Sequence, residues 1–390
     1  MTELNYGLSE MAQEIRSMMR EFAETRVKPV RAELDEKGIF PADLLRELGK
    51  MDLMGLYIPV EYGGTFEGDS LCNIVAVEEL SRVCLGVSTS FAANGLGSDP
   101  ILLGGSEEQK KKYLPPIAAG EKFAAYALTE PNAGSDAGSI RTTAVKKGDK
   151  YVLNGTKQWI TNGGEADTYC VFAVTNKAKG ARGVSCFIVE KGTPGFTFGK
   201  KENKLGIRAS ATRELIFQDC EVPAENLIGR EGTGFIWAMR TFDLSRPGIA
   251  AQAIGLAQGA LDEAVSYAKV REQFGRPVIA NQGLQWMLAD MATKLEAARA
   301  LTYATVRAID AGQKDYSKYS AMCKVFASDM VMEVTTNALQ ALGGYGYMKE
   351  YPVEKMMRDA KILQIYEGTN QIQRDIIGMA LNKEYASLAK

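Results

Sequence analysis

The segments YVLNGTKQWI (residues 151–160), TYCVFAV (168–174), GVSCFIVE (183–190) and TRELIFQDCEV (212–222) decide the fold. Each is rich in β-branched and aromatic residues, which favour strands, and Gly-Gly or Pro-Gly turns lie between them. No helical pattern separates these segments, so a βαβ sheet is not expected. The middle of the chain is therefore predicted to form an antiparallel β-barrel or sandwich.

The sequences on both sides of these strands have helical periodicity. Before them, apolar residues recur on one face, beginning with Met11, Ile15, Met18, Met19 and Phe22. After them, two long apolar stripes occupy Ile249, Ala253, Leu256, Ala260, Ala264 and Ala268, and Leu284, Leu288, Met291, Leu295, Ala298 and Leu301. Helices with small residues along the seam pack as a bundle. PVEYGG (59–64) and the Gly-rich run 95–105 are expected to be loops.

The predicted fold class is therefore α+β and multidomain, which agrees with a length of 390 residues. We expect an N-terminal helical domain at residues 1–122, a middle antiparallel β-barrel or sandwich domain at 123–232 and a C-terminal helical bundle at 233–390. A GxGxxG motif between a strand and a helix is missing, so no Rossmann-type nucleotide site is expected.

The charge balance argues against two classes of partner. The chain has 46 Lys and Arg against 48 Asp and Glu, a net charge of -2, which does not favour a broad phosphate-binding face. The longest uncharged helical stretch, Pro247 to Leu261, contains two glutamines and is shorter than the roughly 20 residues of a membrane span. Neither nucleic acid nor a membrane is expected. No signal or transit peptide is visible, so a bacterial cytoplasm is the expected location, and a mitochondrial matrix protein without its presequence would look the same.

The titratable residue types limit the chemistry. The sequence has no histidine, which excludes a Ser-His-Asp or Cys-His nucleophile system and the usual His-based zinc sites. The six cysteines form no CxxC pair, a pattern typical of buried thiols in a reducing compartment. No metal site is predicted, and proton transfer must use a carboxylate, Lys, Tyr, Cys or a cofactor.

A candidate general base lies in KILQIYEGTNQIQR (361–374). Glu367 follows an apolar helical run and precedes a Gly-Thr-Asn break, a setting that favours partial burial. Burial raises the pKa of a carboxyl from about 4.3 toward the working pH of a base. A glutamate near a helix end is, however, more often solvated or capping the next helix.

Two further clusters carry polar groups suited to a cofactor or a phosphate. In YALTEPNAGSD (126–136) and KQWITNGG (157–164), Thr129, Ser135 and Thr161 offer hydrogen-bond donors and Trp159 a flat apolar wall. Two β-turns with a core tryptophan would produce the same pattern. Arg246 in FDLSRPG (242–248) and Arg271 in REQFG (271–275) carry the fork that binds phosphate oxygens, although isolated arginines on helices usually form surface ion pairs.

Taken in order, YALTEPNAGSD, WITNGG, FDLSRP, REQFG, QALGGYGY, EYPVEKMMRDAK and IYEGTNQIQ resemble the signatures of the acyl-CoA dehydrogenase family. The resemblance runs from the first helix to the last 20 residues. It implies a C-terminal domain that is a four-helix bundle, a homotetramer, and FAD as the cofactor.

The resemblance also assigns roles to individual residues. The cofactor-binding positions in the middle domain would be Tyr126, Leu128, Thr129, Ser135, Trp159, Ile160 and Thr161. Positions contacting the FAD of a neighbouring subunit would be Arg271, Gln273, Phe274, Gln340 and Gly344, while Thr369 and Gln371 would hold the cofactor from the other side. The CoA moiety would be bound by Ser135, Phe242, Asp243, Arg246 and Gly368.

The implied reaction is α,β-dehydrogenation of an acyl-CoA thioester. Glu367 would take the pro-R α-proton as the β-hydride passes to flavin N5, giving a trans-2-enoyl-CoA, with the thioester carbonyl polarised by the Glu367 amide and a ribityl hydroxyl. Some relatives place the base just before the arginine of the FDxxR-type segment. That position is Ser245 here, which has no adequate basicity, so Glu367 is the expected base.

The acyl group and the electron acceptor are less determined. Val87 stands where dicarboxylyl-specific relatives have an arginine, so a dicarboxylyl substrate is disfavoured. Small residues at Ala92, Ala93 and Gly95 leave room for medium, branched or cyclic chains, and Asp99 is either a polar pocket residue or, more commonly for Asp before Pro, a turn former. An electron-transferring flavoprotein is the expected acceptor. The alternatives are an acyl-CoA oxidase, usually a longer chain, an enoyl-CoA reductase, and a non-catalytic flavin-binding assembly factor.

Overall fold

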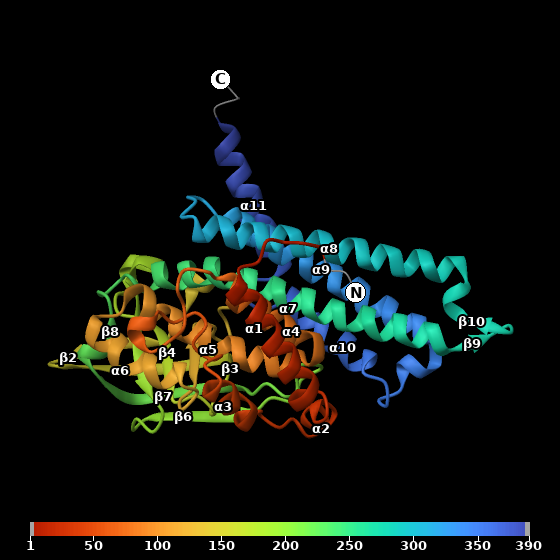
Figure 1. Cartoon of the computed structure of the whole chain (residues 1–390). Helices are drawn as coiled ribbons and strands as arrows, with labels where there is room; N and C mark the ends of the chain where they lie inside the picture. The colour runs from red at the N-terminus through yellow and green to blue at the C-terminus, as the bar shows by residue number, and fades with distance from the viewer. Residues whose placement is uncertain (1–3, 387–390) are drawn as a thin grey trace.

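The computed structural model describes residues 4–386, in which helices are followed by strands and then again by helices (Figure 1). This confirms the predicted α, β, α order. The N-terminal helices are α1 (Glu10–Phe22), α2 (Arg31–Lys37), α3 (Ala42–Lys50), α4 (Leu71–Val83), α5 (Leu85–Gly104) and α6 (Glu107–Ala118). The predicted apolar face of α1 is mostly confirmed, since Ile15, Met19 and Phe22 are buried, whereas Met11 and Met18 are exposed.

Helix α5 corrects the expectation of a loop over residues 95–105. The helix runs through this Gly-rich stretch to Gly104 and contains Pro100, so Asp99 lies within a helix and not in a turn. The glycine content has a packing reason. A Cβ on Gly97 would lie 2.6 Å from the Ala125 main-chain nitrogen, so only glycine allows α5 to approach strand β1 (Ala124–Ala127) this closely. Tertiary packing therefore overrides the local preference for a loop.

The middle domain is an eight-stranded sheet. Besides β1, its strands are β2 (Thr143–Lys147), β3 (Lys150–Thr161), β4 (Thr168–Val174), β5 (Val184–Glu190), β6 (Phe196–Lys201), β7 (Thr212–Pro223) and β8 (Leu227–Ile228). The order is β6-β7-β3-β2-β4-β5-β8, with β1 paired to β4. Most pairs are antiparallel, as predicted, but β1 and β2 each run parallel to β4, so the sheet is mixed.

The C-terminal helices are α7 (Gly234–Val270), α8 (Gln282–Asp310), α9 (Ser317–Leu342), α10 (Val353–Ala360) and α11 (Asn370–Glu384). Helices α7, α8 and α9 pack against one another and α11 packs against α9, which confirms the four-helix bundle. The predicted apolar stripe of α7 is buried from Ile249 to Ala268. Gly255 allows α4 to cross α7 closely, because a Cβ there would lie 2.0 Å from the Glu78 carbonyl oxygen.

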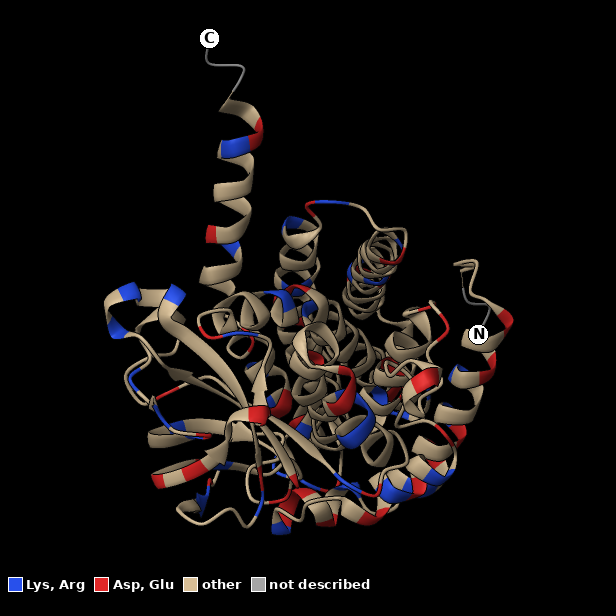
Figure 2. Cartoon of the chain, turned by 90° about the vertical axis from the view of Figure 1, so that its left-hand side faces the viewer, with Lys and Arg blue, Asp and Glu red and all other residues tan. Residues whose placement is uncertain are grey.

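Two parts of the bundle extend away from the rest of the chain. Helix α11 projects from the body in two views at right angles (Figures 1 and 2). The hairpin of β9 (Glu272–Gln273) and β10 (Arg276–Pro277) lies at the end of α7 remote from the sheet (Figure 1). In residues 4–386, no helix combines the length and the apolar character that a membrane span needs. Figure 2 shows basic and acidic residues interspersed along the helices.

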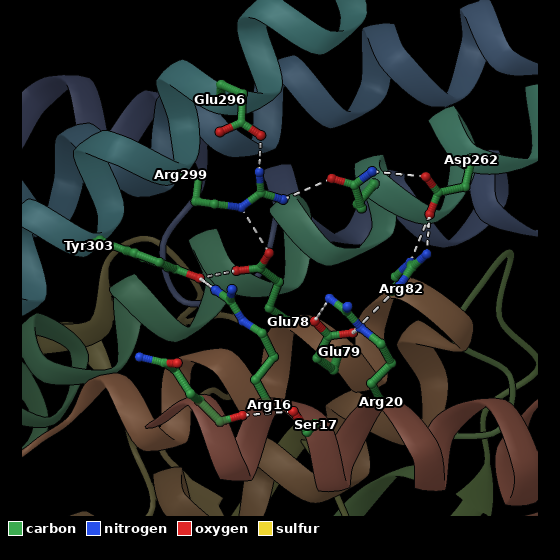
Figure 3. Close-up of polar contacts among 12 residues, drawn as sticks. Arg16, Ser17, Arg20, Glu78, Glu79, Arg82, Asp262, Glu296, Arg299 and Tyr303 are labelled. Carbon is green, nitrogen blue, oxygen red and sulfur yellow. Dashed lines mark hydrogen bonds and ion pairs between the residues drawn. The ribbon is translucent and has the colours of Figure 1, made fainter. Parts of the chain in front are cut away.

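A network of charged side chains joins the first helices to the bundle (Figure 3). Arg299 of α8 donates to Glu78 of α4 at 2.9 Å, and the hydroxyl of Tyr303 donates to the same carboxylate at 2.7 Å. Both Arg299 and Glu78 are buried. Arg82 of α4 also pairs with Asp262 of α7 at 2.6 Å. The N-terminal helices and the bundle are thus fixed to each other by paired charges as well as by apolar contacts.

Candidate active site

Glu367 lies in a left-handed turn between α10 and α11. A 3-10 turn at Lys361–Gln364 follows α10, and α11 begins at Asn370. Between them Glu367 has φ 52° and Gly368 φ 91°. A glutamate in this region is strained, and such strain concentrates at functional positions where surrounding contacts hold it. The structure therefore places the predicted base in a strained turn that the surrounding contacts hold in place.

The carboxylate of Glu367 faces α7 and α9. Ser245 donates its hydroxyl to Glu367 Oε2 at 2.6 Å. Burial raises the pKa of Glu367 above its ordinary value, while the Ser245 hydrogen bond and the positive charges of Arg246 and Lys324 oppose this effect. Ser245, expected to be a poor base, thus supplies a hydrogen bond to the predicted base Glu367. The result is a carboxyl whose pKa is raised in the direction that a general base requires.

Arg246, predicted to bind CoA, is held in place from the side of α7. It is buried, and its guanidinium pairs with Asp243 at 2.6 Å. Asp243 also accepts from the hydroxyl of Ser317 at 2.8 Å. The Nε atom of Arg246 is buried and has no hydrogen-bond partner among the residues described. The guanidinium also lies over the ring of Phe242, 6.0 Å from its centroid. These three predicted CoA residues therefore form one cluster beside Glu367.

Asp99 belongs to the same neighbourhood. Burial, and then the negative charge of Glu367, raise the pKa of Asp99 to about 8. Within residues 4–386 it has no ion-pair or hydrogen-bond partner of its own. Ala92, Ala93 and Gly95 lie on the same helix, and a Cβ on Gly95 would meet the ring of Tyr57 at 3.5 Å. Asp99 is thus an unpaired carboxyl close to the base, not an exposed turn residue.

The two middle-domain clusters lie side by side. The Gln158 amide donates to the Thr129 carbonyl at 2.8 Å, so residues 128–130 run along strand β3. Trp159 has φ 60° and is 60% exposed, although Ile160 beside it is buried. An exposed tryptophan in a strained strand position presents a flat apolar surface to a ligand or partner. The predicted grouping of Leu128, Thr129, Trp159, Ile160 and Thr161 is therefore spatial as well as sequential.

The side chains within that grouping differ in what they offer. Tyr126, Leu128 and Ile160 are buried in the core, so they contact a ligand mainly through their main chain. Thr129 and Thr161 are half-buried, while Ser135 is exposed in the loop after β1. Thr129 and Thr161 can therefore donate hydrogen bonds beside Trp159, and Ser135 stands farther along the loop.

A second predicted set lines a groove at the far end of the bundle. This groove, of about 560 Å³, is lined by Arg271, Gln273, Gln340 and Gly344 among other residues. Phe274 beside it is 97% exposed and has φ 56°. Arg271 follows Arg246 by 25 positions on α7, roughly 37 Å along the helix axis. One chain therefore cannot bring this groove to its own Glu367.

The residues after the base begin α11. Thr369 caps the helix, because its hydroxyl accepts from the Ile372 amide at 3.3 Å. Gln371 is exposed in the first turn, and Gly368 lies next to the base. A Cβ on Gly368 would meet Gln373 Nε2 at 2.7 Å, so the turn requires glycine there.

Sequence reasoning missed two buried lysines. Lys157 is fully buried, pairs with Glu130 at 2.7 Å and donates to the Leu128 carbonyl at 2.9 Å, which fixes both cofactor clusters together. Lys324 of α9 is fully buried and donates to the Gly368 carbonyl. Lys157 is the first residue of the motif KQWITNGG, so its position could have drawn attention to it. Lys324 lies in a helix whose periodicity shows only that the side chain faces inward.

Comparisons with known proteins cover nearly the whole chain. The N-terminal, middle and C-terminal domains of acyl-CoA dehydrogenase match residues 9–121, 125–220 and 232–382. The short-chain-specific acyl-CoA dehydrogenase of Clostridium acetobutylicum is 52% identical over 96% of this chain and 98% of its own length.

Two further relatives differ in what their names describe. Acryloyl-CoA reductase (NADH) of Anaerotignum propionicum is 46% identical over 98% of this chain and 97% of its own. A chain in a structure reported for the electron transferring flavoprotein of Acidaminococcus fermentans superposes with a TM-score of 0.95. It is 54% identical and covers 97% of this chain and 99% of that one.

Proposed function

Because this chain belongs to the acyl-CoA dehydrogenase family, we propose that it converts an acyl-CoA thioester to the trans-2-enoyl-CoA with bound FAD, using Glu367 as the base. The observation that carries this proposal is the setting of Glu367. Its carboxylate is held in a strained turn, hydrogen-bonded to Ser245 and buried enough to raise its pKa. A fixed orientation and a raised pKa are the properties that a carboxylate general base needs.

The residues of the chain act on the thioester in defined ways. Glu367 takes the α-proton, and the Ser245 hydroxyl keeps its carboxylate in one orientation. The Glu367 main-chain amide donates to the thioester carbonyl and stabilises the charge that develops there. Arg246, held by Asp243, draws the CoA moiety to the start of α7. FAD held by the middle-domain residues would supply the acceptor for the hydride of the β-carbon.

The residues present fit FAD. Trp159 offers an exposed ring surface beside the partly exposed Thr129 and Thr161, and the groove at Arg271 offers a guanidinium beside the exposed Gly344. The isoalloxazine part of FAD would be supported from the core by Tyr126, Leu128 and Ile160. Ser135 would lie near its pyrophosphate. Thr369 and Gln371 would hold the cofactor from the side opposite the middle domain.

We propose that a homotetramer completes the site. The groove lined by Arg271, Gln273, Gln340 and Gly344, with Phe274 beside it, lies at the far end of α7 from Arg246, so it does not reach the cofactor beside Glu367 of the same chain. Helix α11 also exposes Met379 and Tyr385 where it projects from the body (Figure 1). Unpaired apolar surface of this kind supports burial against a second copy.

The substrate and the electron acceptor follow from the relatives. A short, branched or cyclic acyl chain fits small residues at Ala92, Ala93 and Gly95, and the short-chain relative supports that size. Val87, fully buried, offers no charge for a second carboxylate. The structural relative connected with an electron transferring flavoprotein supports such a protein as acceptor. We place this chemistry in the bacterial cytoplasm.

Anaerobic titration of the yellow protein with straight, branched, cyclic and aromatic acyl-CoA thioesters tests the proposal. Short or cyclic acyl groups are expected to bleach the flavin absorbance, whereas a protein that no acyl-CoA bleaches would be a non-catalytic flavin-binding factor. Rapid peroxide formation when the reduced protein meets air would mark an oxidase.

Replacing the base is the sharpest test of its role. Glu367→Gln should retain FAD but bleach roughly 10²- to 10⁴-fold more slowly, because a neutral amide cannot accept the proton. Glu384→Gln, at the other end of α11 and bonded to Lys318, is the matched control and should bleach as the native protein does. Near-native bleaching by Glu367→Gln would show that another group is the base.

The reverse direction is a second candidate, favoured by the reductase relative. Reduction of an enoyl-CoA uses the same residues, with Glu367 returning the proton to the α-carbon. To test this, the photoreduced protein is mixed with enoyl-CoA without oxygen, and the rate of flavin reoxidation is measured. Comparing it with the rate at which acyl-CoA bleaches the oxidised flavin decides which direction is faster.

A further inference from the structure

Lys324 is a buried lysine that the proposed reaction does not yet use. It lies on the inward face of α9 and is fully buried. Its Nζ donates to the Gly368 carbonyl oxygen and to Asn370 Oδ1, both at 2.8 Å. Both acceptors are uncharged, and Lys324 forms no ion pair within residues 4–386. A buried ammonium without a carboxylate in contact costs free energy, so a functional reason for it is expected.

The hydrogen bonds of Lys324 are made to the turn that carries the base. Gly368 follows Glu367, and both have positive φ. Gln373 also donates to the Gly368 carbonyl, at 2.9 Å. Asn370, the second acceptor of Lys324, donates in turn to Asp329 at 2.7 Å. The turn is therefore held from α9 by Lys324 and from α11 by Gln373, against its own strain.

The charge of Lys324 acts on the same carboxylate. The groups whose charges act on Lys324 are Glu367 in the turn, Arg246 of α7, Asp329 of α9 and Arg374 of α11. Burial lowers the pKa of Lys324 to about 7, and the Glu367 carboxylate opposes that effect. Lys324 in turn lowers the pKa of Glu367, as Arg246 does, against the effect of burial. The ammonium and the carboxylate therefore support each other's charged forms.

We propose that Lys324 is a positioning residue that fixes the turn presenting Glu367 and supplies positive charge beside the carboxylate. This inference rests on the proposed role of Glu367 as the base. Lys324 does not touch the reacting atoms, and it acts through the Gly368 carbonyl and through its field. Displacing a base by about 1 Å costs on the order of 100-fold in rate, so its loss should be measurable without unfolding the protein.

Rapid-mixing measurement of flavin bleaching as a function of pH tests this proposal on FAD-loaded protein. Lys324→Met should bleach about 10- to 100-fold more slowly at pH 7. Its acidic limb should move to higher pH, because a carboxylate without a neighbouring cation takes up a proton more readily. Lys324→Gln keeps a donor without the charge and should show the same pH shift with a smaller loss of rate. FAD content and binding of the enoyl-CoA product should stay native.

Lys318→Met is the matched control, since Lys318 is a buried lysine of the same helix that bonds Glu384 and not the turn. Native rate and native pH profile in Lys324→Met would overturn the inference. A slower rate in Lys324→Met and Lys324→Gln with the acidic limb of the pH profile unshifted would also overturn the inference. A merely structural role of Lys324 predicts that result. Glu367→Gln, measured in parallel, separates the two hypotheses: native bleaching there refutes the base, and not Lys324 alone.

Discussion

Glu367 and Asp99 are two carboxyls with raised pKa values in one neighbourhood, but their surroundings differ. Glu367 receives a hydrogen bond from Ser245 and the influence of Arg246 and Lys324, which oppose the effect of burial. Asp99 has burial and the charge of Glu367 acting in the same direction, and its pKa reaches about 8. Of the two carboxyls, Glu367 alone has a hydroxyl and positive charges that oppose the effect of burial on its pKa. Asp99, with a pKa of about 8, is the protonated neighbour at neutral pH.

The raised pKa of Asp99 predicts a pH-dependent stability. From about pH 4 to about pH 8 the folded protein retains a proton on Asp99 that the unfolded chain releases, so stability from this group is lost as pH rises through this window. Asp99→Asn removes the titration. The difference in melting temperature, Asp99→Asn minus native, should therefore increase by roughly 2 °C or more from pH 5 to pH 9.

Thermal unfolding of both proteins at matched FAD occupancy gives this difference. Exposed Asp43→Asn, whose partner Arg46 is also exposed, is the control and should follow the native protein across the range. A difference between Asp99→Asn and the native protein that is constant with pH would contradict the assignment of a protonated Asp99.

At the scale of elements, strand β3 carries the exposed Trp159 and is fixed to the segment 128–130 by one buried pair. Lys157 and Glu130 lie 2.7 Å apart, and the main-chain amides of Arg141 and Thr142 also donate to Glu130. Burial alone would raise the pKa of Glu130, but Lys157 and these donors lower it overall. Burial lowers the pKa of Lys157 to about 8. The pair therefore sets the distance between the two predicted cofactor segments.

Breaking this pair from one side should be costly. Lys157→Met leaves Glu130 buried without its cation, and a loss of roughly 3–5 kcal/mol in the free energy of unfolding is expected. FAD should also dissociate more readily, because residues 128–130 lose both contacts of Lys157 and, of their hydrogen bonds to β3, keep only the main-chain bond from Gln158. Denaturant unfolding and flavin release on dilution measure the two effects.

Lys150→Met on the same strand is the comparison, since Lys150 and Glu221 form an exposed pair 2.9 Å apart. That variant should lose about 1 kcal/mol or less and should retain FAD. Equal losses in the two lysine variants would show that the buried pair has no special role.

At the scale of the molecule, the long helix α7 separates the base from the groove at Arg271. Arg246 lies in the first half of α7 and Arg271 just after its end, with β9 and β10 beyond (Figure 1). The charged network of Arg299, Glu78 and Tyr303 fixes the N-terminal helices to the same bundle (Figure 3). One chain therefore holds its own Glu367 and its own groove apart, and we expect a complete site to combine two chains.

Complementation between inactive variants tests that arrangement. Arg271→Ala should lower FAD affinity with its base intact, and Glu367→Gln should lack the base with its groove intact. After subunits of the two proteins are mixed and reassembled, roughly a quarter of the sites should combine a native base with a native groove and regain bleaching. Mixed assemblies as inactive as the parent variants would show that Arg271 serves its own chain.

Several features of this protein follow from its sequence alone. Periodicity and strand composition predict the α, β, α order, because the spacing of apolar side chains is local and burial needs one face. The absence of histidine excludes whole classes of mechanism by composition alone, and the ordered motifs identify the family and predict Glu367 as its base. The buried stripe of α7 is also local, since Ile249 to Ala268 repeat at helical spacing.

Only the tertiary structure decided the rest. Local preference predicts a loop at residues 95–105, but close packing on β1 makes it helix α5. The hydrogen bond from Ser245 to Glu367 joins residues 122 positions apart, and the one from Lys324 to Gly368 joins residues 44 positions apart. No local sequence pattern predicts such contacts. The physical reason is that a pKa, a strained turn and an unpaired carboxyl depend on which distant groups the fold brings into contact.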